Sequence, residues 1–233
     1  MNSKIKKSLI YAFPHTIPIM TGFLFLGMTY GILMRVSGFS IWIALAASVF
    51  IFAGSMQFVA VNILLSPFAP LQAFLMTLMI NARHLFYGIS MLERYKGSGA
   101  KKPYLIFALC DETFSVNCSV DIPEDADRHW FMFFVTLLDQ LYWVAGTLLG
   151  AAFGSFISFN TAGLDFVMTA MFAVIFLEQL LKEKHLSVPL AGLGCTILCL
   201  LIFGADSFII PAMITIIAAL ALLRKSIEKG GAA

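Results

Sequence analysis

Long apolar stretches separated by short polar connections run along the whole chain. A membrane-spanning helix needs about 20 mostly apolar residues, and the stretches that approach this length are 17–34, 41–65, 69–92, 104–120, 130–153, 164–181, 186–203 and 208–223. The connections between them are too short for a soluble domain. The pattern therefore predicts an all-α fold in which residues 1–233 form a single polytopic transmembrane helical bundle of seven or eight membrane segments.

Composition supports a membrane protein and excludes several other classes. Of 233 residues, 60% are hydrophobic and 12% are charged, whereas a soluble domain has about 25% charged residues. The basic residues lie at segment ends without interleaved aromatics, which argues against nucleic-acid binding. The four cysteines lie within apolar segments and show no disulfide or zinc spacing. We interpret them as small packing residues.

The segment 69–92 has charged residues at its centre. An arginine in the middle of a membrane helix costs about 2.5–3.5 kcal/mol even on insertion-based scales, and such residues usually face a protein-lined cavity. Helical geometry places Arg83, Tyr87 and Ser90 on one face, and Thr77, Asn81 and His84 on the adjoining face. One half of this helix is polar, which favours a transporter.

The next two segments also present charged residues to one side. Asp111 and Glu112 lie in one sector of the fourth segment, and Asp139 shares a face with Trp143 in the fifth. Arg83 could pair with Asp111 or with Asp139 as an internal strut. His84 could be a structural hydrogen-bonding group or a proton relay, and Glu112 could lie near a span end and reach water.

The positions of the basic residues conflict with a simple count of crossings. Four basic clusters precede the first segment and follow the third, the sixth and the last, and all would prefer the cytoplasm. We expect both termini in the cytoplasm and the acidic loop 121–128 outside. Three crossings cannot return the chain to the same side, so either some basic loops violate the rule or one segment in each triplet does not cross fully. The candidates are 41–65, which is interrupted at Ala53-Gly54-Ser55-Met56-Gln57, and the short segment 164–181.

Glycines repeat at helical spacing in two of the apolar segments. The first pair is Gly27 and Gly31, and the second set is Gly146, Gly150 and Gly154. This spacing lets two helix backbones approach closely. It could serve packing within the chain or contact with a second subunit.

Five short motifs occur in a fixed order along the chain. They begin at Ala53, Asn81, Asp111, Asp139 and Gly163, and they read AGSMQF, NARHLFYGIS, DETF, DQLYW and GLDF. This ordered set resembles the AzlC/YgaZ family of branched-chain amino acid exporters. The resemblance extends along nearly the whole chain. It implies a multi-pass permease of the bacterial cytoplasmic (inner) membrane that works with a small hydrophobic AzlD-type subunit and exports branched-chain amino acids, with methionine as a further candidate substrate.

A zwitterionic amino acid needs donors for its carboxylate and an acidic partner for its ammonium group. Arg83 or the backbone amides at Gly54 could supply the donors, and Asp111 or Asp139 the acid. The predicted substrate-binding or translocation residues are Gly54, Ser55, Gln57, Asn81, Arg83, His84, Tyr87, Asp111, Glu112 and Asp139.

No nucleotide-binding glycine loop is present in the sequence, and we predict no cofactor and no metal. Transport would then draw on an ion gradient, the membrane potential or the substrate gradient. Two alternatives stay open. One is a passive channel, and the other is an intramembrane hydrolase that uses Ser55 as nucleophile with His84 as base.

Overall fold

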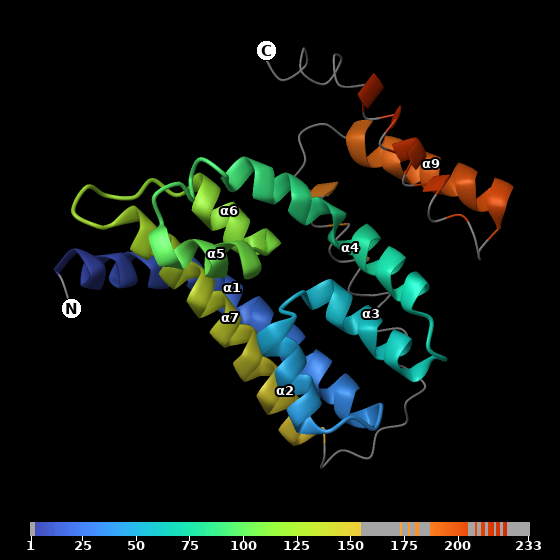
Figure 1. Ribbon diagram of the computed structural model, residues 1–233, viewed down its shortest axis with the longest axis horizontal. Helices are drawn as coiled ribbons and strands as arrows, with labels where there is room; N and C mark the ends of the chain where they lie inside the picture. Colours follow the sequence, from blue (N-terminus) through green and yellow to red (C-terminus); the bar gives the residue numbers. More distant parts are fainter. Residues whose placement is uncertain are drawn as a thin grey trace. The chain divides into compact units, whose positions relative to one another are not determined.

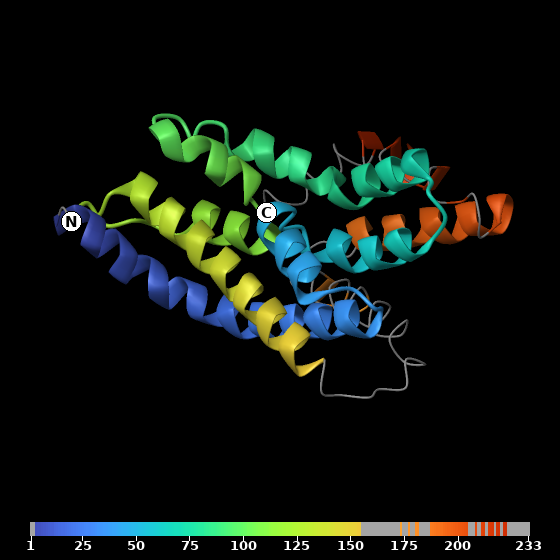
Figure 2. The ribbon, with the colours of Figure 1, turned by 60° about the horizontal axis from the view of Figure 1, so that its bottom comes forward.

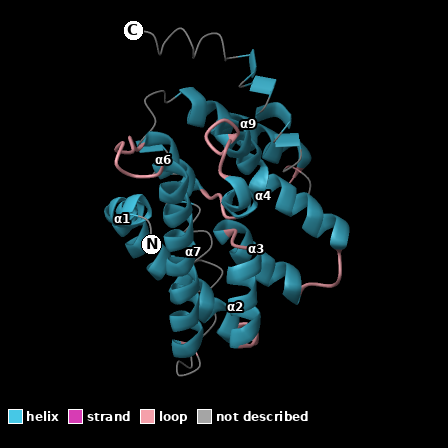
Figure 3. Ribbon diagram, turned by 60° about the vertical axis from the view of Figure 1, so that its left-hand side comes forward, coloured by secondary structure: helices cyan, strands magenta, loops and turns pink. Residues whose placement is uncertain are grey.

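The computed structural model describes residues 3–154 and 187–204, together with isolated positions between 173 and 222. The chain divides into two compact units, Met1–Leu164 and Asp165–Ala233, and each is described by itself. All described elements are helices (Figures 1 and 3), so the all-α prediction is confirmed for these residues. In the second unit, the predicted segment 186–203 forms α9, Ser187–Phe203. The predicted segments 164–181 and 208–223 lie largely outside the described residues, and the total of seven or eight segments stays a prediction.

Two long helices form the frame of the first unit. They are α1, Ser3–Val36, and α7, Arg128–Phe153, and they are the two described helices that are long and apolar enough to cross a membrane. They lie side by side and run in the same direction (Figures 1 and 2), since Leu24 approaches Gly146 and Met28 approaches Gly150.

Glycines let these two helices touch backbone to backbone. A Cβ atom on Gly146 would lie 2.7 Å from the carbonyl oxygen of Leu24, and one on Gly27 would lie 2.8 Å from that of Trp143. Only glycine permits so close an approach. The predicted glycine faces are therefore used for packing within the chain, and they are not free to receive a second subunit.

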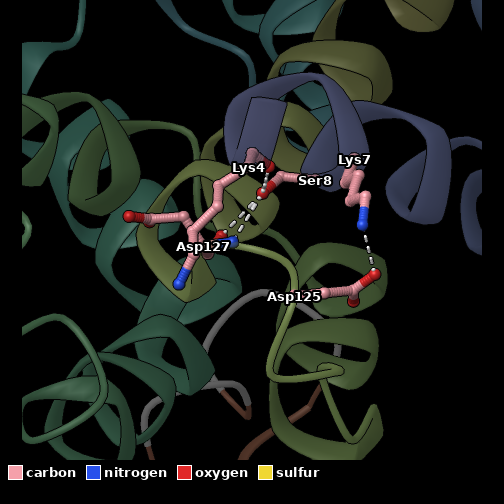
Figure 4. Close-up of polar contacts among 5 residues, drawn as sticks. All are labelled: Lys4, Lys7, Ser8, Asp125 and Asp127. Atoms are coloured by element: carbon pink, nitrogen blue, oxygen red, sulfur yellow. Dashed lines mark hydrogen bonds and ion pairs between the residues drawn. The ribbon is translucent and has the colours of Figure 1, made fainter. Parts of the chain in front are cut away.

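The beginnings of α1 and α7 are joined by polar contacts (Figure 4). Lys7 Nζ lies 2.9 Å from Asp125 Oδ2. The Ser8 hydroxyl donates to the carbonyl of Asp127 (3.0 Å) and accepts from its backbone N–H (2.9 Å). The Asp127 carboxylate accepts from the N–H of Trp130 (3.0 Å) and caps α7. The N-terminal ends of α1 and α7 lie together here, and we call this the first end of the unit. We call the end where α1 and α7 finish the second end.

These contacts overturn one prediction of topology. The acidic loop 121–128 was expected on the opposite side of the membrane from the N-terminus. It lies instead beside the N-terminal lysines, because Asp125 pairs with Lys7. The rule used for the prediction counts only lysine and arginine, so it does not detect that an acidic loop can lie on the same side as a basic segment and neutralise it.

The segment 41–65 is interrupted, as predicted. It forms α2, Ile41–Phe50, and α3, Gly54–Leu65. Between them Phe52 has a φ of +43°, a conformation that is strained for a bulky residue. Gly54 is the first residue of α3, so the gap lies just before the predicted position.

The two halves of this segment form a hairpin. Residues from both line one apolar cavity of about 300 Å³, with Ile43 and Ala47 on α2 and Val61 and Leu64 on α3. Since α2 begins at the second end, where α1 finishes, α3 returns the chain to that end. We call residues 41–65 the first hairpin. The next helix, α4, Pro70–Met91, then runs to the first end.

The predicted continuous segment 104–120 is also interrupted, which the sequence reading missed. A 3₁₀ turn, η1, Gly99–Lys101, leads into α5, Lys102–Phe107, and α6, Asp111–Ser119, follows after a gap. At the gap Cys110 is extended, with φ −116° and ψ 179°. The acidic pair that opens α6 favours a new helix start, because carboxylates are stabilised at helix N-termini.

This second interrupted segment starts and finishes at the first end. Lys101 Nζ lies 4.3 Å from the ring centre of Trp130, at the beginning of α7. Arg94, just after α4, donates to the carbonyl of Asn117 near the end of α6 (2.7 Å). We call residues 102–119 the second hairpin. The two hairpins thus enter the unit from opposite ends, and α1, α4 and α7 run its full length.

Candidate functional site

Arg83, near the middle of α4, joins the tips of both hairpins. Its Nη1 lies 2.6 Å from Asp111 Oδ2 in the first turn of α6. Its Nη2 donates to Ser55 Oγ in the first turn of α3 (3.2 Å). The side chains of Arg83 and Asp111 are 30% and 29% exposed, so the ion pair is accessible. Of the two predicted partners for Arg83, the structure selects Asp111.

The local backbone explains why these groups meet. Helices α3 and α6 both begin at a hairpin tip, so both present their N-termini to the centre of the unit. The first amides of a helix lack intrahelical partners and carry partial positive charge. No side chain caps α3 at Ala53 or α6 at Cys110. The site therefore combines one guanidinium, one carboxylate and two helix N-termini.

The tip of the first hairpin packs on α7. A Cβ atom on Gly54 would lie 3.2 Å from Cη2 of the Trp143 indole, which is nearly buried. The fully buried Gln57 donates to Ser48 Oγ (3.4 Å), and Ser48 donates to Thr147 Oγ1 on α7 (2.8 Å). Gln57 therefore joins α3 to α2, and Ser48 joins the hairpin to α7.

Aromatic rings cover one side of the Arg83–Asp111 pair. Tyr87, one turn after Arg83, stacks on Phe114 of α6 with ring centres 4.4 Å apart. His84 packs edge-on against Tyr87 at 5.7 Å. These contacts hold α4 against α6, and they place two of the predicted site residues beside the ion pair.

Asp139 lies apart from the ion pair, deep on α7. Its side chain is fully buried, and Oδ2 accepts a hydrogen bond from Thr113 Oγ1 in the first turn of α6 (2.7 Å). Its second oxygen, Oδ1, has no partner among the described residues. Thr113 was missed by the sequence reading, because a threonine in an apolar helix usually bonds its own backbone.

The other predicted residues are less directly engaged. Glu112 is half-buried in the first turn of α6, and it has no basic partner in the part of the chain that the structure describes. Asn81 is half-buried on α4. The hydrolase alternative lacks its central contact, since Ser55 bonds Arg83 and makes no hydrogen bond to His84. No group of three acidic, cysteine or histidine residues within the described ranges could hold a metal ion.

Comparisons with known proteins identify the family. The family described as AzlC protein matches residues 18–157. The chain is 57% identical to "Branched-chain amino acid transport protein AzlC" of Bacillus subtilis (strain 168), over 97% of this chain and 89% of that protein. It is 47% identical to an "Uncharacterized membrane protein" of Haemophilus influenzae, over 88% and 84% of the two chains. It is 26% identical to "Inner membrane protein YgaZ" of Escherichia coli (strain K12), over 85% and 82%.

No solved structure matches the chain. The relatives are membrane proteins, and the named ones include a transport protein, so the sequence-based recognition of family and membrane class is confirmed. The family match spans both hairpins, Arg83 and α7. The chain belongs to the AzlC family of membrane transport proteins.

Proposed function

We propose that this chain exports branched-chain amino acids, and methionine as a related aliphatic substrate, across the bacterial cytoplasmic membrane. The name of the Bacillus subtilis relative, at 57% identity, supports the substrate class. The observation that carries a transport mechanism is the contact of Arg83 with Ser55 and Asp111. It joins two interrupted helices at one accessible charged pair.

The charges at this point suit a zwitterion. In the free protein the guanidinium of Arg83 and the carboxylate of Asp111 neutralise each other. An entering amino acid presents a carboxylate and an ammonium group, so it can take the place of each partner without leaving a charge unpaired. The uncapped amides at the start of α3 supply further donors for the substrate carboxylate.

The hairpins supply a route for alternating access. In this proposal α1, α4 and α7 cross the membrane, while the first hairpin enters from the second end and the second hairpin from the first end. Interrupted helices that meet near the membrane midplane are a recurrent way to build a transporter site. Movement of either hairpin tip away from Arg83 would open the site to one side.

The first end is assigned to the cytoplasm. Basic residues gather there in the first turns of α1 and from the end of α4 to the start of α5, namely Lys4, Lys6, Lys7, Arg94, Lys96, Lys101 and Lys102. Positively charged short segments are retained on the cytoplasmic side. These two clusters are separated by two long helices, α1 and α4, and by the first hairpin, so both can lie on the same side.

A small hydrophobic AzlD-type subunit is proposed as the partner. The experiment is to feed cells dipeptides of isoleucine, leucine, valine or methionine and to follow the intracellular free amino acids. Cells with this chain and the small subunit should clear them, and cells with this chain alone should clear them slowly or not at all. Equal clearance by the chain alone would contradict the two-subunit proposal.

The passive-channel alternative is separated by kinetics. A carrier should show saturable flux and counterflow, in which internal unlabelled leucine drives entry of labelled leucine into proteoliposomes. A channel shows neither. Unsaturated flux without counterflow would reject the carrier mechanism and keep the membrane-transport class.

A further inference from the structure

A buried carboxylate behind the start of α6 has no compensating charge among the residues that the structure describes. Asp139 is fully buried. Thr113 donates to one of its oxygens, and the other has no partner among the described residues. An ionised carboxylate in such a place is costly, and a buried acid normally becomes neutral by taking up a proton.

Within the described ranges, no cationic side chain is found next to Asp139. The titratable groups that face it all belong to the second hairpin, and they are Tyr104, Cys110 and Glu112. All three are acids. Arg83, the base of the site, is already engaged by Asp111 and Ser55. The carboxylates of Asp111, Glu112 and Asp139 therefore lie around the start of α6, and Arg83 is the one guanidinium beside them in the described part of the chain.

The space around Asp139 selects the smallest cation. A side chain with 0% exposure touches no opening that admits even a water molecule. A sodium ion or the ammonium group of an amino acid does not fit there without rearrangement, whereas a proton needs no added volume. This separates Asp139 from Asp111, whose side chain is 29% exposed and can be reached by substrate.

We propose that Asp139 is the proton-binding site that couples transport to a proton gradient, with Thr113 linking it to the substrate site. The proposal rests on the transport function proposed above. Thr113 lies two residues after Asp111 in the first turn of α6. Loss or gain of the proton changes the hydrogen bond between Asp139 on α7 and Thr113 on α6. This changes how tightly α7 binds the tip of the second hairpin, which carries Asp111 and places it against Arg83.

The first test measures proton binding without transport. Infrared spectra of the purified full-length protein should contain the carbonyl band of a protonated carboxylic acid at neutral pH. The band should be absent in Asp139→Asn and present in Glu112→Gln, the matched control. In Thr113→Val the band should persist to higher pH, because the hydroxyl that stabilises the ionised form is gone. A band that survives in Asp139→Asn, or is lost only in Glu112→Gln, would overturn the proton site.

The second test measures coupling in proteoliposomes, with the small subunit added if leucine counterflow requires it. For one proton per substrate, an imposed pH gradient of one unit should drive about tenfold leucine accumulation in the wild type. Both gradient polarities are used, so that symport and antiport are each detected. Asp139→Asn should keep counterflow and lose this accumulation. Wild-type-like accumulation in Asp139→Asn would overturn the coupling role.

The two proposals can fail separately. Absence of counterflow in the wild type, with and without the small subunit, would reject the transport function, and the infrared spectra would still judge the proton site. Counterflow with accumulation that follows a sodium gradient and ignores pH would keep the transport function and reject proton coupling.

Discussion

At the scale of single residues, the site depends on one arginine that contacts two helix starts. Arg83 was recognisable in the sequence because a charge inside an apolar segment is costly and needs a reason to be there. The partner of Arg83 could not be predicted in the same way, because helical geometry allows it to pair with either Asp111 or Asp139. The structure separates them by burial and by the interruption before α6.

Arg83→Ala should abolish leucine transport, because it removes the donor for the substrate carboxylate and leaves Asp111 without its cation. The free energy of unfolding should also fall. Breaking an exposed ion pair costs up to about 1 kcal/mol and breaking a buried one about 3–5 kcal/mol, and this partly exposed pair should lie between these values. Leucine counterflow and thermal unfolding in detergent measure the two effects. The double variant Arg83→Ala with Asp111→Asn should be more stable than either single variant and still inactive.

The control for this test is a pair that does not belong to the site. Lys96 lies 3.9 Å from Glu93, and both side chains are more than three-quarters exposed. Lys96→Ala should leave transport and unfolding unchanged. Full transport by Arg83→Ala would reject the proposed substrate site.

At the scale of elements, the two hairpins differ in how far the sequence reveals them. The first contains a run of small and polar residues around Gly54, and this predicted its interruption. The second is interrupted at Ala108-Leu109-Cys110, where nothing breaks a helix, and only the acidic start of α6 hints at it. Tertiary contacts such as that of Thr113 with Asp139 stabilise this break, and they cannot be read from local pattern.

Gly54→Leu should block transport while Gly54→Ala should keep part of it. A Cβ atom at Gly54 would lie 3.2 Å from the Trp143 ring, a contact that a shift of a few tenths of an ångström relieves. Leucine needs far more room, so it should push the hairpin tip off α7 and move Ser55 away from Arg83. Counterflow rates measure this. Gly22→Leu, where no atom lies within 4 Å of an added Cβ, is the control.

The packing of α1 on α7 gives a separate prediction at this scale. A Cβ atom on Gly150 would overlap the carbonyl group of Met28. Gly150→Ala should therefore force the two helices apart and lower stability by at least the about 1–3 kcal/mol typical of overpacked cores. Thermal unfolding in detergent, with Gly22→Ala as control, measures it. An unchanged midpoint would contradict the parallel glycine contact.

At the scale of the whole molecule, the sequence predicted class and family well, and its placement of the acidic loop was wrong. In the proposed arrangement, a first hairpin that does not cross the membrane removes the conflict between basic clusters and crossing number for the first two clusters. The remaining clusters, after residue 181, lie outside the described residues. The acidic loop was assigned to the wrong side because the sequence gives no sign that Lys7 and Asp125 form a pair.

Cysteine labelling tests the arrangement of loops directly. In a background without the four native cysteines, Lys96→Cys and Glu124→Cys should be protected from a membrane-impermeant maleimide in intact cells and should react after permeabilisation. Ser66→Cys, between α3 and α4, should react in intact cells. The physical reason is that Lys7 and Asp125 lie 2.9 Å apart, and no ion pair of that length can join groups on opposite sides of a hydrocarbon layer about 30 Å thick. Labelling of Glu124→Cys in intact cells while Lys96→Cys stays protected would show that the second hairpin crosses the membrane, and it would reject the arrangement proposed here.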